Sequence, residues 1–116
     1  MLAIGTDIVK IERIQKLLND NGDKFLNKIF NKKEIQYCNS YTKPHVNLSG
    51  KYAAKEAVKK ALISAKLINH ISMKDIQVLN NQDKTPYVII NNINDVKCNI
   101  SISHDGDYAT AVAIIE

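Results

Sequence analysis

Apolar residues recur with a helical spacing in the first 70 residues of the chain and fall into short strand-like segments after them. Intervals of three and four residues are typical of helices, whereas alternation or a short apolar run is typical of strands. One earlier apolar segment, residues 2–11, is interrupted by Gly5-Thr6-Asp7. The pattern predicts an N-terminal strand, a helical part and then consecutive strands, which together make an α+β domain.

Two breaks divide the helical part. A first helix is expected to begin near residue 11 and to end in the polar run 19–23, because Asn, Asp and Gly tolerate turn conformations. One or two short helices are expected within residues 25–37, interrupted around residues 31–33. The longest helix is expected to begin at Pro44, since proline suits a first helical turn, and to reach about residue 67.

The last third of the chain contains four expected strands, at residues 76–79, 87–90, 98–103 and 108–115. Residues 80–86 and 105–107, which separate them, are rich in the residues that form turns. Two antiparallel hairpins are therefore expected.

A length of 116 residues fits one domain, residues 1–116, and is too short for two full cores. No apolar run approaches the roughly 20 residues of a membrane span, and the N-terminus carries no basic leader, so we expect neither a membrane protein nor an exported one. Cys38 and Cys98 stand far apart without a C-x-x-C motif or a paired histidine. They indicate a cytoplasmic protein rather than a disulfide framework or a zinc site.

The chain is basic, with a formal net charge of +4 and a pI near 9.0. This charge favours an anionic partner, which could be nucleic acid, a phosphorylated small molecule or an acidic protein. Arg13, Lys24 and Lys28 belong to a cationic region within the first 33 residues. That region could dock an acidic protein, or it could be ordinary solvated charge, because acids are interspersed with it. Little aromatic interleaving and no nucleic-acid motif make RNA binding the weaker interpretation.

The long helix carries an acid among lysines. Tyr52, Glu56 and Lys60 follow at intervals of four and share one face, and a basic row of Lys51, Lys55 and Lys59 adjoins them. One interpretation is a solvated Lys–Glu surface. The other is a site for a metal-bound phosphate ester, which needs a carboxylate set among cations.

Asp7 lies between the first strand and the first helix, where it could cap the helix or act as a metal ligand. If Asp7 and Glu56 converge, their oxygens together with phosphate and water could complete the octahedral shell of Mg²⁺. Near the C-terminus, Ser101 and Ser103 share one face of a strand and His104 lies at its end. This end could form the wall of a ligand site, or His104 could simply be solvated beside a turn.

These stretches, in this order, resemble the bacterial holo-acyl-carrier-protein synthases, the small 4'-phosphopantetheinyl transferases of fatty-acid synthesis. The resemblance extends over nearly the whole chain. It is carried by Gly5-Thr6-Asp7-Ile8 with Arg13-Ile14, by residues 50–57 (GKYAAKEA) with Lys60-Ala61, by Thr85-Pro86-Tyr87 and by residues 101–104 (SISH).

The resemblance implies the 4'-phosphopantetheinyl transferase fold and a Mg²⁺-dependent reaction. In that reaction coenzyme A gives its 4'-phosphopantetheine arm to a serine of apo acyl carrier protein and releases adenosine 3',5'-bisphosphate. It also implies a homotrimer with sites between subunits. Either Glu56 or a metal-bound water would take the serine proton.

The site residues carried over from the family fall into three groups. Asp7 and Glu56 would bind the metal, and Lys60 would contact phosphate as a third catalytic residue. Lys51, Ser103 and His104, with Lys60, would bind coenzyme A. Arg13, Lys24 and Lys28 would dock the carrier protein.

The chain departs from the family pattern at three places. Lys51 stands where arginine is usual, Lys84 stands where a glycine is expected before Thr85-Pro86, and residues 62–67 replace a glycine-rich turn. Two alternatives therefore stay open. One is a family member that binds coenzyme A without turnover, and the other is a small basic binding module for RNA or an acidic protein.

Overall fold

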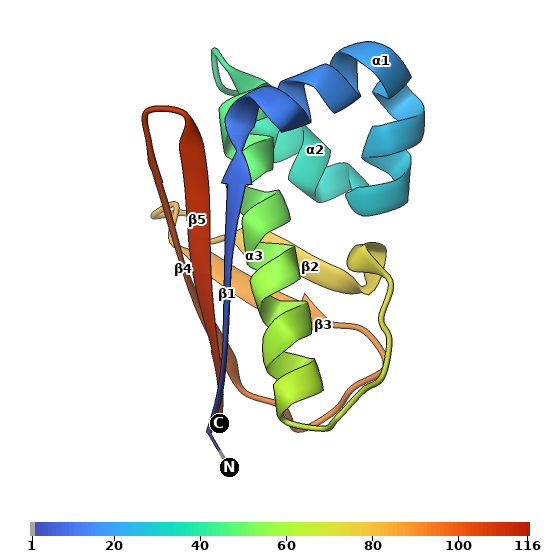
Figure 1. The fold of residues 1–116 in the computed structure, drawn as a ribbon, viewed down its shortest axis with the longest axis vertical. Coiled ribbons are helices and arrows are strands. Elements are labelled where there is room, and N and C mark those ends of the chain that lie inside the picture. Colours follow the sequence, from blue (N-terminus) through green and yellow to red (C-terminus); the bar gives the residue numbers. More distant parts are fainter. Residues whose placement is uncertain (1) are drawn as a thin grey trace.

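The computed structural model describes residues 2–116 and contains a helical layer packed on antiparallel strands (Figure 1). The elements in chain order are β1 (Ala3–Lys10), α1 (Ile11–Ile29), α2 (Lys32–Asn39), α3 (Pro44–Ser64), the 3₁₀ turn η1 (Met73–Asp75), β2 (Ile76–Asn80), β3 (Pro86–Ile90), β4 (Cys98–Asp105) and β5 (Tyr108–Ile115). The predicted α+β order is confirmed. Within residues 2–116, no helix combines the length and the apolarity needed to cross a membrane.

The strands form two separate antiparallel sheets. The larger sheet has the order β1-β5-β4, so that the C-terminal strand is central, and the smaller sheet pairs β2 with β3. Both predicted hairpins are present, as β2–β3 and β4–β5. β1 pairs with β5 along its whole length, from Ala3 opposite Ile115 to Lys10 opposite Tyr108. The first and last strands of the chain therefore lie side by side (Figure 1).

Small residues allow α3 to lie directly on the larger sheet. The inward positions of the central strand are the buried residues Ala109, Ala111 and Ala113. On β1, a Cβ atom added to Gly5 would lie 1.9 Å from the carbonyl oxygen of Ala57 on α3. That position therefore admits only glycine, and the close contact sets the backbone of β1 against α3 just before Asp7.

The predicted helix boundaries need two corrections. α1 does not stop in the polar run 19–23 but continues to Ile29, with a kink at Gly22, where the backbone leaves the helical region (φ 48°, ψ −122°). Glycine adopts this conformation without a Cβ clash, so the polar run bends the helix instead of ending it. The long helix ends at Ser64, three residues before the expected boundary, and the left-handed Lys66 (φ 60°) follows it.

A buried ion pair joins the helices to β2. The Lys55 ammonium donates to the Glu34 carboxylate at 2.9 Å and to the carbonyl oxygens of Met73 at 3.0 Å and Ile76 at 2.6 Å. Glu34 in turn accepts from the backbone N–H groups of Asn31 at 2.8 Å and Val78 at 2.9 Å. Both side chains are completely buried, and the network joins α2, α3, η1 and β2.

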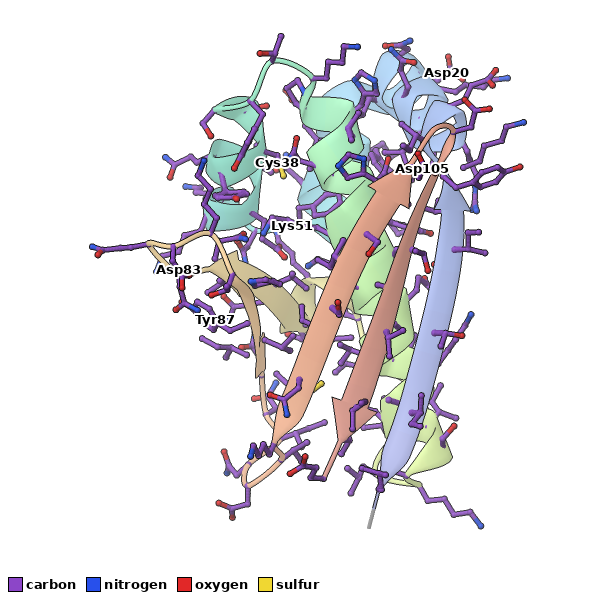
Figure 2. All side chains as sticks on the ribbon, turned by 90° about the vertical axis from the view of Figure 1, so that its left-hand side faces the viewer. Asp20, Cys38, Lys51, Asp83, Tyr87 and Asp105 are labelled. Carbon is purple, nitrogen blue, oxygen red and sulfur yellow. The ribbon has the colours of Figure 1, made fainter. Side chains whose placement is uncertain are left out.

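The outer face of the larger sheet carries several exposed apolar side chains. Its large side chains are Leu2, Ile4, Ile8, Tyr108 and Val112, all between 38% and 66% exposed. In Figure 2 the three strands lie in front of α3, and no helix of the described chain covers them. Contiguous exposed apolar side chains are a common feature of interaction surfaces.

Candidate active site

Polar side chains gather on one side of α3, where it packs on β1. The Lys60 ammonium donates to the Asp7 carboxylate and to the carbonyl oxygen of Thr6, each at 3.0 Å. The Asp7 side chain is only 16% exposed and that of Lys60 is 53% exposed. Asp7 lies inside β1, and the residue at the N-terminal cap of α1 is Lys10, so the capping interpretation of Asp7 is wrong.

Glu56 belongs to the same group. The pKa of Tyr52, on the same face of α3, is raised by burial and then by the negative charge of Glu56; Arg13 opposes this rise and Asp7 adds to it. These side chains are therefore close enough to act on one hydroxyl. No hydrogen bond or ion pair within residues 2–116 occupies the Glu56 carboxylate.

The ligand set of this group suits a hard cation that retains exchangeable ligands. Among residues 2–116 there is no cluster of three or more His, Cys, Asp or Glu side chains. Zinc is usually held by three or four protein ligands, whereas Mg²⁺ is commonly held by one or two carboxylates together with substrate phosphates and waters. Asp7 and Glu56 fit the second arrangement.

The expected row of basic residues beside Glu56 is not a surface row. The Lys51 side chain is buried, and its ammonium donates to the carbonyl oxygen of Val78 and to Asn80 Oδ1, both at 2.6 Å. Burial lowers its pKa. Lys55 is buried in the ion pair with Glu34. The solvated Lys–Glu interpretation of the helix is therefore wrong for these two lysines, which point toward β2.

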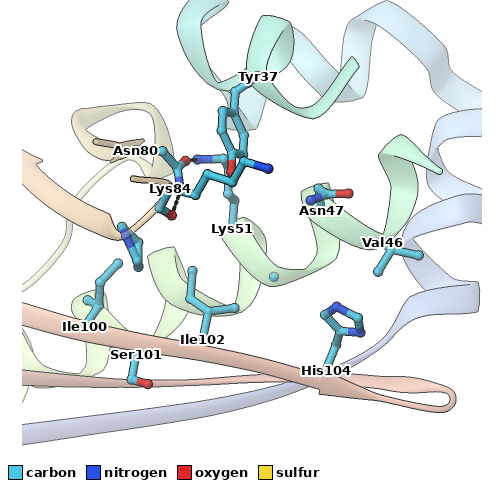
Figure 3. A pocket seen from close by; sticks show the side chains of 12 residues that line it. Tyr37, Val46, Asn47, Lys51, Asn80, Lys84, Ile100, Ser101, Ile102 and His104 are labelled. Carbon is cyan, nitrogen blue, oxygen red and sulfur yellow. Dashed lines mark hydrogen bonds between the residues drawn. The ribbon is translucent and has the colours of Figure 1, made fainter. Parts of the chain in front are cut away.

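A pocket of about 270 Å³ lies on the other side of α3, between α3, β4 and the β2–β3 hairpin (Figure 3). Its floor depends on Gly50, because a Cβ atom there would lie 2.9 Å from Ile102 Cγ2. Its lining contains basic and amide side chains and no Asp or Glu. The lining residues are Tyr37, Val46, Asn47, Gly50, Lys51, Asn80, Lys84, Pro86, Ile100, Ser101, Ile102 and His104.

The structure separates two residues that the sequence placed together. His104 lines the pocket, but Ser103 does not. Adjacent residues of a strand point to opposite faces, so the exposed Ser103 lies on the outer face of β4. The pocket also contains Tyr37, Asn47 and Asn80, which sequence analysis missed, because no local pattern distinguishes them from other polar residues of helices and turns.

The three predicted docking residues lie on α1 and are all exposed. Arg13 lies in the first part of α1, close enough to Tyr52 to affect its pKa. Lys24 and Lys28 follow the kink at Gly22 and so belong to a second helical segment with a different direction (Figure 1). Of the three docking residues, the structure therefore places only Arg13 close to Asp7 and Glu56.

The fold and the sequence together identify a known class of transferase. The model of the 4'-phosphopantetheinyl transferase superfamily matches residues 3–113, and the chain belongs to this family. Within it, the chain is similar to holo-[acyl-carrier-protein] synthases. It is 45% identical to the one from Thermodesulfovibrio yellowstonii, over 97% of this chain and 96% of that protein. It is 39% identical to the one from Aquifex aeolicus, over 97% of each chain.

Solved structures agree with this assignment. The Chronobacterium ammoniagenes ACPS–CoA complex matches with a TM-score of 0.86 at 27% identity, over 99% of this chain and 96% of that one. The Helicobacter pylori holo-[acyl-carrier-protein] synthase in complex with coenzyme A matches with a TM-score of 0.85 at 29% identity, over 97% and 99%. The predicted family, fold class and enzyme class are confirmed.

Proposed function

We propose that the protein transfers the 4'-phosphopantetheine group of coenzyme A to a serine hydroxyl of apo acyl carrier protein. The reaction would depend on Mg²⁺, release adenosine 3',5'-bisphosphate and serve fatty-acid synthesis. One observation carries the proposal. Asp7, from β1, and Glu56 and Lys60, from α3, form one group in a chain that is similar to holo-[acyl-carrier-protein] synthases over nearly its full length.

The residues of this group have distinct tasks. Asp7 and Glu56 would hold Mg²⁺, which when bound neutralises charge on the coenzyme A diphosphate. Lys60 uses two of its three N–H groups on Asp7 and Thr6, so the third can donate to a phosphate oxygen. Because no described residue occupies the Glu56 carboxylate, it is also available to accept the proton of the attacking serine.

We also propose that the protein is a homotrimer with sites between subunits. Asp7 lies on β1 and the pocket is lined by β4, and these strands are the two edges of the larger sheet. α3 lies between the two regions. A neighbouring copy could bring its pocket next to these carboxylates and cover the apolar outer face of the sheet. Sedimentation equilibrium is expected to give three times the 13.0 kDa mass of the chain. A monomer mass at assay concentration would contradict the trimer.

Arg13 is proposed to dock the carrier protein, with Lys24 and Lys28 extending its basic surface. Because Arg13 lies close to Glu56 and Asp7, a carrier protein bound at Arg13 would present its serine to these carboxylates. Arg13→Ala is expected to raise the KM for the carrier protein about tenfold, the usual effect of losing one charge-assisted contact. The KM for coenzyme A should change by less than about twofold.

Lys97→Ala, which removes the same charge from an exposed residue just before β4, is the matched control. It should leave both KM values unchanged. Equal increases in the two KM values of Arg13→Ala would remove Arg13 from the docking surface.

A mass-shift assay tests the proposed function. The protein is incubated with Mg²⁺, coenzyme A and apo carrier protein, and the mass of the intact carrier protein is then measured by mass spectrometry. A gain of one phosphopantetheine group is expected, and neither a chelator-treated sample nor a carrier without its serine should show it. No gain would refute the enzyme, and salt-sensitive RNA binding without transfer would favour the basic binding module.

A cytoplasmic location is also proposed. Cys38 and Cys98 are both free thiols in the structure, as expected in a reducing compartment. Fractionation of the source cells tests this, and recovery with secreted proteins would contradict it.

A further inference from the structure

The pocket between α3, β4 and the β2–β3 hairpin has one lysine that is free to bind a ligand. Its basic residues are Lys51, Lys84 and His104, and none of its lining residues is acidic. The ammonium of Lys51 is already held by Val78 and Asn80. Lys84 is exposed, and within residues 2–116 its ammonium has no hydrogen bond and lies 5.8 Å from the centre of the Tyr41 ring, at the edge of the pocket.

The backbone of Lys84 is in an unusual conformation for a lysine. Its φ angle is +74°, in the left-handed region that glycine occupies without strain. The turn holds it there from both sides. The Lys84 N–H donates to the carbonyl oxygen of Asn81 at 2.9 Å, and the Asn81 N–H donates to that of Thr85 at 2.9 Å. A residue whose backbone is held in a strained conformation beside a pocket is a candidate for a functional role.

Hydrogen bonds through Asn80 connect Lys84 to the buried Lys51 (Figure 3). Asn80 accepts from the Lys51 ammonium through Oδ1, and it donates through Nδ2 to the carbonyl oxygen of Lys84 at 2.9 Å. Lys51 is only 3% exposed, so it fixes Asn80 from the interior. Lys51 therefore acts on the pocket by positioning this turn, and the side chain of Lys84 is left to meet the ligand.

The remaining walls favour a nucleotide with a separate phosphate. The apolar lining residues Val46, Pro86, Ile100 and Ile102 could contact a flat base, and Lys84, Asn47 and His104 supply polar groups. In the proposed reaction, the diphosphate of the donor belongs with Asp7, Glu56 and Lys60. The other anionic group of coenzyme A is the phosphate monoester on its ribose, and it carries up to two negative charges that need a cation.

We propose that Lys84 binds this ribose phosphate and determines the preference of the protein for the phosphorylated donor. The inference rests on the proposed function, because the identity of the ligand comes from it. Lys84 would act through a charge-assisted hydrogen bond, which adds affinity only for ligands that carry the monoester. Lys84, on the β2–β3 hairpin, would thus provide the positive charge for the phosphate, because the ammonium of the buried Lys51 is already held by Val78 and Asn80.

The test compares coenzyme A with 3'-dephospho-coenzyme A, which lacks the monoester. Lys84→Asn is the informative variant, because asparagine tolerates the left-handed conformation and carries no charge. We expect it to weaken the binding of coenzyme A, measured by titration calorimetry, about tenfold. Binding of the dephosphorylated ligand should change by less than about twofold, so that the preference between the two ligands decreases.

Lys66→Asn is the matched control, because Lys66 is also an exposed left-handed lysine (φ 60°) and does not line the pocket. It should leave both affinities unchanged. Lys84→Gly and Lys66→Gly should both raise Tm by relieving the backbone, but only Lys84→Gly should weaken coenzyme A. The change in Tm reports the relief of backbone strain, and the change in coenzyme A affinity reports the loss of the Lys84 charge.

An equal loss for both ligands in Lys84→Asn, or no loss for either, would overturn the assignment. Because binding is measured without carrier protein, the result is independent of the mass-shift assay. A protein that fails to transfer but loses its ligand preference in Lys84→Asn would refute the proposed function and retain this inference. A protein that transfers while Lys84→Asn keeps its preference would do the reverse.

Discussion

Glu56→Gln is expected to reduce the transfer rate by about three orders of magnitude, because it removes one of the two carboxylates proposed to hold Mg²⁺, the ion that would offset the charge of the diphosphate. The amide has nearly the same shape, and no hydrogen bond within residues 2–116 depends on the Glu56 carboxylate. The fold should therefore be retained. The rate is measured from the mass gain of the carrier protein, and Tm is measured in parallel.

Glu116→Gln is the control for this change, since Glu116 is a half-exposed acid at the end of the chain. It should transfer at the parental rate. If Glu56→Gln also transfers at that rate, Glu56 is not part of the site. A raised Mg²⁺ requirement in a partly active variant would instead support its role as a metal ligand.

Glu34→Ala is expected to lower the free energy of unfolding by about 3–5 kcal/mol, because it leaves a buried ammonium without its counter-charge. The Lys55 ammonium would keep the carbonyl oxygens of Met73 and Ile76 but lose the carboxylate. The buried N–H of Val78 would lose its acceptor as well. Urea unfolding measures the loss, which is a large part of the 5–15 kcal/mol typical of a domain.

An exposed ion pair provides the comparison. Lys97 and Glu116 lie 3.6 Å apart with side chains 70% and 51% exposed, so Glu116→Ala should cost less than about 1 kcal/mol. Equal losses of unfolding free energy in Glu116→Ala and Glu34→Ala would show that the buried ion pair stabilises the fold no more than the exposed pair does.

The deficit of Glu34→Ala should also depend on pH. Burial lowers the pKa of Lys55 below its ordinary 10.5, and the charge of Glu34 opposes this effect. Without Glu34 the folded state binds the Lys55 proton less tightly than the unfolded state does. Stability relative to the parent protein should therefore rise as pH increases toward 10.5, and the deficit should be largest near neutral pH.

Local sequence patterns predicted the elements well where each element follows its own periodicity. The alternating and apolar runs after residue 70 correspond to β2 through β5, and the stripe of alanines corresponds to α3. The prediction failed at Gly22 because turn-forming residues allow either an end or a kink. Packing of the segments on either side decides between them, and residues 19–23 carry no information about it.

Sequence alone determined the candidate chemistry of this protein: two carboxylates, a lysine at a helical interval from one of them, and a histidine at a strand end. The tertiary structure decided which of these groups meet. Gly5 brings β1 against α3 and so places Asp7 beside Lys60. Lys51 and Lys55, which the sequence pattern places in a basic row beside Glu56, instead point into the interior. A periodic pattern predicts which residues share a face of a helix, but only the packing of that helix determines whether the face contacts water, a sheet or a pocket.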